Sequence, residues 1–195
     1  MAQAPLQLIV DLNVKELAAY LNDHFAGSIA AIELLDHLAK EFDGQRLGTF
    51  FREIRDDVRT DQDVLRGLME KLGVEESGLR KAGAWILEKV GQAKLNVSGN
   101  EAGGLGLLQA LEGLALGITG KQLLWRSLAT AARNSAKLQG MDFKRLEQRA
   151  KEQFERVEAE RLKAASEALS RRPPKKRFIA NVSGGADVRN GVQPD

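Results

Sequence analysis

The sequence has no cysteine among its 195 residues. This absence excludes thiolate catalysis, disulfide bonds and cysteine-ligated zinc, because each of these needs a thiol. Histidine is scarce as well: only His24 and His37 occur, and both lie in the same stretch of chain. A Ser–His–Asp catalytic set therefore has few candidate bases, and the sequence has no nucleophile-elbow motif that would support one.

Long apolar runs are also missing. No stretch approaches the roughly 18 uninterrupted apolar residues of a transmembrane helix. The first residues, MAQAPLQLIVDLN, lack the basic start of a signal peptide. The charge is nearly balanced, with 29 Lys and Arg against 27 Asp and Glu. These features predict a soluble, cytoplasmic protein without a membrane span and without the basic surface that nucleic-acid binding needs.

Apolar residues instead recur at three- and four-residue intervals through four long segments, which is the period of an amphipathic helix. No comparable stretch alternates with the two-residue period of a strand. We therefore expect an all-α fold, with residues 1–170 as a single helical-bundle domain and 171–195 as a basic, disordered tail. The helices are expected at about residues 14–42, 47–72, 105–138 and 142–170, with a short extra helix at about 78–96 on the crossover.

Side chains suited to helix ends mark several of these boundaries. Asn13 is a good N-cap, and Glu16 stands where a capping box needs it. Gly44 suits the left-handed cap that ends many helices. Only residues 43–46 separate the first two helices, so we expect these helices to be antiparallel neighbours.

Three charged residues fall on helix faces that should be buried. They are Asp36, Asp61 and Lys121. An isolated charge is too costly to bury, so each should have a partner of opposite sign. We interpret the three residues as a structural ion-pair network within the bundle.

Three stretches of the chain resemble an uncharacterised bacterial family with ferritin-like four-helix-bundle architecture. They are YLNDHFAGSIAAIELL from Tyr20, WILEKVGQAKLN from Trp85 and LEGLALGITGKQLLWRSL from Leu111. The resemblance covers about residues 14–138, and the last helix follows by position. It implies two antiparallel helix pairs joined by a long crossover, and it carries no assigned activity.

Di-iron proteins of the ferritin-like class place Glu on two helices and Glu-x-x-His on the other two. Here Glu33 and His37 are one residue too far apart for that motif. An alternative hypothesis retains a divergent iron or manganese site, but Lys121 favours the ion-pair interpretation because a dication repels an ammonium group. The ligands of the alternative site would be Glu33, Asp36, Asp61, Glu158 and His24.

A cluster of basic residues follows the last predicted helix. Such a cluster binds an acidic partner weakly and without sequence specificity. We interpret it as part of a solvated tail, with partner binding as the alternative. The cluster comprises Arg171, Arg172, Lys175, Lys176 and Arg177.

The expected function is that of a non-catalytic module for interaction or assembly, with no cofactor. Its partner would be another protein or a second copy of the chain, in a homodimer formed through an exposed helix face. The alternative function is that of a divergent, carboxylate-rich metal-binding protein of the di-iron or di-manganese type.

Overall fold

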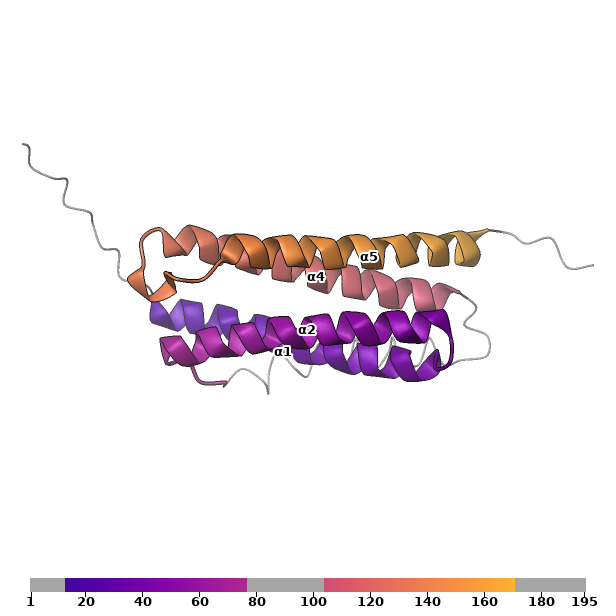
Figure 1. Cartoon of the computed structure of the whole chain (residues 1–195), viewed down its shortest axis with the longest axis horizontal. Coiled ribbons are helices and arrows are strands. Elements are labelled where there is room, and N and C mark those ends of the chain that lie inside the picture. The colour runs from indigo at the N-terminus through magenta and orange to yellow at the C-terminus, as the bar shows by residue number, and fades with distance from the viewer. Residues whose placement is uncertain (1–12, 77–103, 171–195) are drawn as a thin grey trace, which may run out of the picture.

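The computed structural model describes residues 13–76 and 104–170 of the chain, and these form four long helices (Figure 1). No strand occurs in this part of the chain, which confirms the all-α prediction. The extra helix predicted at about 78–96 and the basic tail from residue 171 lie outside the described residues. The helices are α1 (Val14–Glu41), α2 (Arg46–Leu72), α4 (Leu105–Ala132) and α5 (Phe143–Leu169).

Three of the four predicted helices agree with the observed ones to within one residue at each end. The exception is the helix predicted at 105–138, because α4 ends at Ala132 and is followed by a 3₁₀ turn, η2 (Ala136–Leu138). Asn13 acts as the N-cap that the sequence predicts, because its Oδ1 accepts a hydrogen bond of 3.4 Å from the Glu16 amide. Asp142 caps α5 in the same way, and its Oδ1 accepts a hydrogen bond of 2.9 Å from the Arg145 amide.

The turn between α1 and α2 depends on two glycines. Gly44 has φ of +71°, a left-handed conformation that side chains disfavour. Gly48 lies so close to the end of α1 that a Cβ atom there would overlap the carbonyl oxygen of Phe42. These glycines therefore allow a short, tight turn to join the two helices as an antiparallel hairpin.

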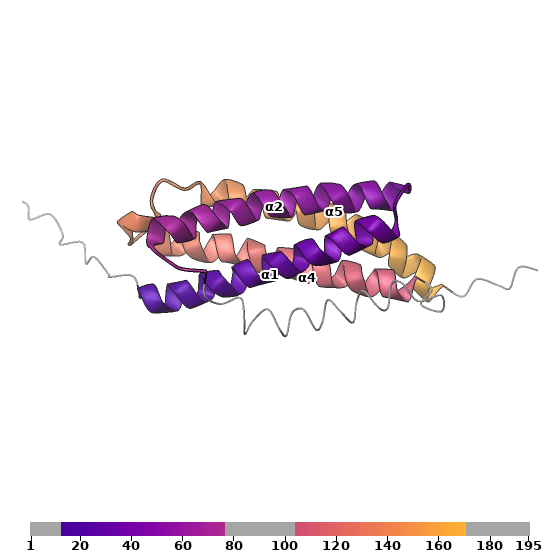
Figure 2. The same cartoon turned by 90° about the horizontal axis from the view of Figure 1, so that it is seen from below.

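The four helices form two antiparallel hairpins, α1–α2 and α4–α5, packed side by side (Figures 1 and 2). α1 lies against α4 and α2 lies against α5. Contacts between the two hairpins show in which direction each helix runs relative to the others. Arg46, at the start of α2, pairs with Glu160 near the end of α5, whereas Lys71 Nζ donates to the Gln139 carbonyl at the other end. α2 and α4 are consequently parallel, so α2 ends and α4 begins at opposite ends of the bundle (Figure 1).

The core runs along the axis of the bundle between the two hairpins. Trp125 is its largest buried side chain, and its ring stacks on Phe143 with centroids 6.4 Å apart. Burying an aliphatic or aromatic side chain of this size contributes about 1.5–3 kcal/mol to folding. No helix in the described part of the chain is long and apolar enough to cross a membrane. The other fully buried large side chains are Phe25, Phe51, Leu21, Leu35, Leu38, Ile54, Leu68, Met69, Leu111, Leu124 and Leu128.

An ion pair holds α2 to α5 at one end of the bundle. The Arg46 guanidinium donates two hydrogen bonds, of 2.9 and 2.6 Å, to the Glu160 carboxylate. Lys163 adds a third bond to the same carboxylate at 2.9 Å. The hydrogen bonds from Arg46 lower the pKa of Glu160 to about 2, although burial of the carboxylate opposes the shift.

We predict that this ion pair makes stability depend on pH in the acid range. The pKa of Glu160 is lower in the folded chain than in the unfolded one, so its contribution is complete above about pH 4.5 and is lost as the pH falls towards about 2. At pH 7, Glu160→Gln should lower the free energy of unfolding by about 1–2 kcal/mol, because Arg46 is largely solvated. Urea unfolding followed by circular dichroism at several pH values measures the difference.

The matched control is Glu155→Gln, which changes an exposed glutamate on the same helix and should have little effect. The difference between wild type and Glu160→Gln should shrink as the pH falls from about 4.5 to about 2. If the difference in unfolding free energy between wild type and Glu160→Gln were the same at pH 7 and pH 3, the proposed contribution of the ionised Glu160 would be contradicted.

Candidate functional site

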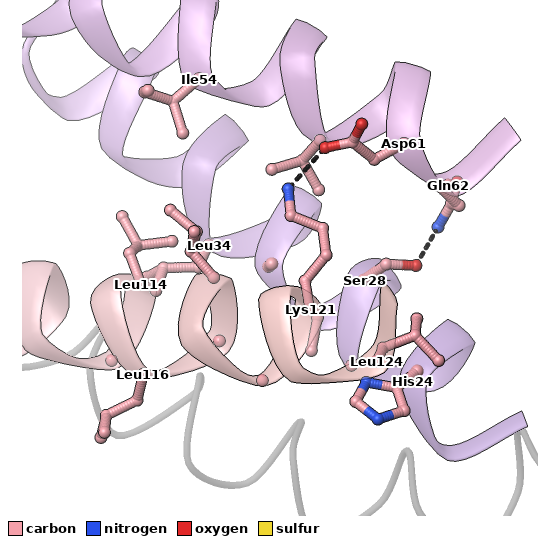
Figure 3. Close-up of a pocket in the computed structure, with 18 of the residues that line it drawn as sticks. His24, Ser28, Leu34, Ile54, Asp61, Gln62, Leu114, Leu116, Lys121 and Leu124 are labelled. Carbon is pink, nitrogen blue, oxygen red and sulfur yellow. Dashed lines mark hydrogen bonds and ion pairs between the residues drawn. The ribbon is translucent and has the colours of Figure 1, made fainter. Parts of the chain in front are cut away.

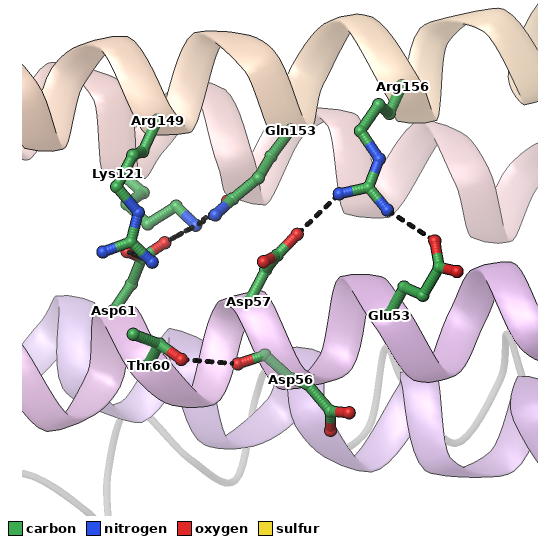
Figure 4. A network of polar contacts seen from close by, with 9 residues as sticks. All are labelled: Glu53, Asp56, Asp57, Thr60, Asp61, Lys121, Arg149, Gln153 and Arg156. Carbon is green, nitrogen blue, oxygen red and sulfur yellow. Dashed lines mark hydrogen bonds and ion pairs between the residues drawn. The ribbon is translucent and has the colours of Figure 1, made fainter.

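Asp61 lies halfway along α2 and is 3% exposed, and its carboxylate is bound by side chains from two other helices (Figure 4). Lys121 Nζ on α4 is 2.6 Å from Asp61 Oδ2. Gln153 Nε2 on α5 donates to the same oxygen at 2.9 Å, and Gln153 Oε1 accepts a hydrogen bond from Lys121 Nζ. Three helices thus meet in a closed polar cluster of Asp61, Lys121 and Gln153.

The second oxygen of Asp61 has a charge partner but no aligned hydrogen bond. Arg149 Nη2 lies 3.1 Å from Oδ1, yet the geometry is too bent for a hydrogen bond, and Oδ1 is otherwise unbonded. One buried carboxylate therefore faces two cations. Burial lowers the pKa of Lys121, and the Asp61 carboxylate opposes that shift. Within the cluster, the charges of Asp61 and Lys121 cancel, and Arg149 adds a second cation at its partly exposed edge.

Asp36 does not join this cluster, although the sequence predicts it on a buried face. Its side chain is 44% exposed at an outer edge of the α1–α2 hairpin. There it pairs with Arg55 at 2.9 Å and with Arg59 at 3.2 Å. The buried face of α1 passes through Leu35 and the residues one turn away, so a residue at the margin of the predicted apolar face reaches solvent.

The residues of the alternative metal site do not converge. Glu158, on α5, is held by Arg161 at 2.6 Å, Asp36 is held by arginines at the surface, and Asp61 is held by Lys121. His24 and Glu33 lie more than two turns apart on α1. Among the described residues, no group of three or more acidic, histidine or cysteine side chains could hold a metal ion. Three of the site's carboxylates, those of Asp36, Asp61 and Glu158, are paired with cations.

Beside the polar cluster, residues of α1, α2 and α4 line a partly open pocket of about 630 Å³ (Figure 3). Small residues line its α1 and α4 walls, and a Cβ atom added at Gly27, Gly113 or Gly117 would meet nothing within 4 Å. The volume falls in the range of about 300–1,000 Å³ that is typical of ligand sites. The apolar wall includes Ala30, Ala31, Leu34, Ile54, Val58, Leu65, Ala110, Leu114, Ile118, Leu124 and Trp125.

His24 and Trp125 bring polar groups to this otherwise apolar wall. Burial lowers the pKa of His24, against a smaller opposing effect of Asp23, so the imidazole is neutral at pH 7. Its ring meets Tyr20 edge-on, with centroids 4.7 Å apart. Trp125 Nε1 is buried and has no hydrogen-bond acceptor among the residues that the structure describes. An unpaired buried donor is costly, so this N–H group favours an acceptor brought by a ligand.

Three glycines in the sequence are consistent with a pocket, but glycines alone do not identify a pocket. Gly113, Gly117 and Gly120 interrupt the apolar face of α4. Glycine in a helix interior is equally consistent with close helix packing and with open space, and the structure places open space at Gly113 and Gly117. Comparison of the chain with protein-family models, curated proteins and solved structures found no match.

We predict that removing the Asp61 carboxylate destabilises the fold more than removing its lysine partner. Asp61→Ala leaves Lys121 buried without a counter-ion and should cost about 3–5 kcal/mol of unfolding free energy. Lys121→Met should cost less, because Arg149 and Gln153 still contact Asp61. Urea unfolding of the two single variants and the double variant gives the coupling energy of the pair.

The double variant should be more stable than Asp61→Ala alone, since it no longer buries an unpaired ammonium group. A cost below about 1 kcal/mol for Asp61→Ala would show that the carboxylate is solvated and unpaired in solution.

Proposed function

We propose that this protein is a non-catalytic helical bundle that binds an apolar ligand between its two hairpins. The observation that carries the proposal is the pocket of about 630 Å³ between α1, α2 and α4, whose walls are mainly aliphatic (Figure 3). A monomer of this size would ordinarily fill such a volume, because protein interiors are packed as densely as organic crystals. Four residues of small volume, Gly27, Ala31, Gly113 and Gly117, keep the pocket open.

The connectivity supports kinship with ferritin-like bundles, which also consist of two antiparallel hairpins joined by one long crossover. In di-iron members of that class, carboxylates in the bundle core hold the metals. Here an ammonium group, Lys121 Nζ, stands against the core carboxylate of Asp61 at 2.6 Å. The proposed role is therefore ligand binding without metal-dependent chemistry.

We predict that filling the pocket abolishes binding of a neutral apolar probe. N-phenyl-1-naphthylamine fluoresces strongly in apolar surroundings, and wild-type protein should bind it saturably with one probe per chain. Gly117→Leu places a branched side chain into the open space and should remove that binding. Gly113→Leu tests the same wall at a second position.

Gly67→Leu is the matched control, because Gly67 is also an exposed helix glycine with nothing within 4 Å of an added Cβ, but it does not line the pocket. Circular dichroism checks that all three variants fold. Equal binding by Gly117→Leu and Gly67→Leu, or no saturable binding by the wild type, would refute the proposal.

A second candidate function, assembly of two copies of the chain, rests on an exposed row of leucines. Leu105, Leu116 and Leu123 share one face of α4, since spacings of eleven and seven residues are whole numbers of helical turns. Leu116 is 74% exposed and points away from Leu114, although it also borders the pocket (Figure 3). A two-fold axis beside this face would bury the same row from both copies.

We predict that Leu116→Asp shifts the chain towards the monomer in sedimentation equilibrium, with unchanged helical content. The matched control is Leu162→Asp, which changes an exposed leucine on α5, outside the row on α4. A wild-type protein that is monomeric at the highest concentration measured would contradict assembly without bearing on the pocket.

A further inference from the structure

The pocket follows the antiparallel helices α1 and α4 over several turns. On α1, every turn from His24 to Leu34 contributes to the lining, which is a span of about 15 Å along the helix axis. On α4, the lining extends from Gln109 to Trp125. Gly120 lies opposite His24, since a Cβ atom added at Gly120 would be 4.0 Å from Cε1 of that imidazole. A space of this shape suits an elongated ligand, such as an alkyl chain.

The two ends of the pocket differ in polarity (Figure 3). Polar side chains gather at the end where His24 lies (Figure 3). There the Gln62 amide donates a hydrogen bond of 2.8 Å to the Ser28 hydroxyl, which itself donates to the Phe25 carbonyl at 2.6 Å. The Ser28 hydroxyl is therefore already bonded within the fold. The opposite end is lined by aliphatic side chains, those of Leu34, Ile54 and Leu114.

The charged groups of the lining offer no free partner to a charged ligand. Lys121 Nζ lies 2.6 Å from Asp61 Oδ2 and also donates to Gln153 Oε1. Asp23 is the other charged residue of the described lining, and it is exposed to solvent, which screens its charge. A charged head inside the pocket would lose its hydration without gaining a counter-ion, and that loss is costly. The lining therefore favours an uncharged ligand.

His24 is the polar side chain that remains available at this end. Its ring contacts Tyr20 edge-on, and neither ring nitrogen has a hydrogen-bond partner among the described residues. The nitrogens are also absent from the buried, unbonded atoms of these residues, so a ligand can reach them. Burial lowers the pKa of His24, and the neutral imidazole has one N–H donor and one acceptor nitrogen. The matching ligand group both donates and accepts a hydrogen bond.

We infer that the pocket binds an uncharged aliphatic alcohol, with its hydroxyl at His24 and its chain extending towards Leu34 and Leu114. The inference rests on the proposed function and adds the chemical class of the ligand. A hydroxyl group donates one hydrogen bond and accepts others, so it can bond whichever ring nitrogen carries the proton. The hydrocarbon chain fills volume that the small residues of α1 and α4 leave open.

Displacement of N-phenyl-1-naphthylamine from the full chain at pH 7 tests this ligand class. Decan-1-ol and 1-methoxynonane are isomers, but the ether accepts hydrogen bonds and cannot donate one. The alcohol should compete about three- to tenfold more tightly than the ether, which is the contribution of one hydrogen bond. Decanoate and decyltrimethylammonium carry opposite charges on a chain of the same length. Each ion should compete at least about tenfold more weakly than the alcohol.

Two histidine variants locate the hydroxyl. His24→Phe keeps an aromatic ring beside Tyr20 but removes both nitrogens, so decan-1-ol should compete no better than 1-methoxynonane. His37→Phe is the matched control, because His37 is the second histidine of α1 and does not line the pocket. This control should keep the preference of the wild type for the alcohol.

Nitrogen NMR of the two histidine rings gives a readout that needs no variant for the site itself. Addition of decan-1-ol to wild-type protein should shift the ring nitrogen signals of His24 and leave those of His37 unchanged. His37→Phe assigns the two sets of signals. This measurement decides the question if His24→Phe does not fold.

The outcomes separate this inference from the proposed function. Equal competition by decan-1-ol and 1-methoxynonane, or tightest competition by either ion, overturns the alcohol assignment while the apolar pocket stands. An unchanged preference for the alcohol in His24→Phe, or unshifted His24 signals, also overturns it. Failure of the wild type to bind the naphthylamine probe overturns both.

Discussion

A single buried carboxylate, that of Asp61, constrains the relative positions of three helices. It accepts hydrogen bonds from Lys121 on α4 and Gln153 on α5, so α2, α4 and α5 must keep one register. Sliding either helix by one turn, about 5.4 Å, would leave a charge buried and unpaired. Apolar packing alone tolerates rearrangement more easily, whereas this cluster permits one arrangement of the two hairpins.

The same cluster contains no residue of α1, which contacts α4 elsewhere, for example through the hydrogen bond of 3.4 Å from the Tyr20 hydroxyl to Ser127 Oγ. Lys121 reaches from α4 to α2 and α5, and the α4 wall of the pocket includes Ala110, Gly113, Gly117 and Gly120. Small residues on both sides, such as Gly27 and Gly117, would let two helices approach closely. Here α1 and α4 contact each other, and the pocket lies beside the small residues of their interface.

Periodicity and capping residues predict the helices because their causes are local. The pairing of Asp61 with Lys121 follows from two opposite charges on buried faces, but the sequence does not reveal Gln153 and Arg149 as their partners. Gln153 follows Ala150 and precedes Val157 on the buried face of α5, and that position is the signal that could have found it. The exposure of Asp36 and the presence of the pocket depend on the distance and rotation between packed helices. The periodicity of a single helix does not reveal either quantity.

Asp61 and Lys121 hold the two hairpins in one register, and an apolar pocket lies beside this ion pair. A crystal structure determined under xenon pressure tests this arrangement most directly, because xenon occupies dry apolar cavities. The account predicts xenon between Leu34 and Leu114, with Lys121 Nζ still bonded to Asp61. Direct contact of α1 with α4 along Gly27 and Gly117, with no xenon between them, would contradict it.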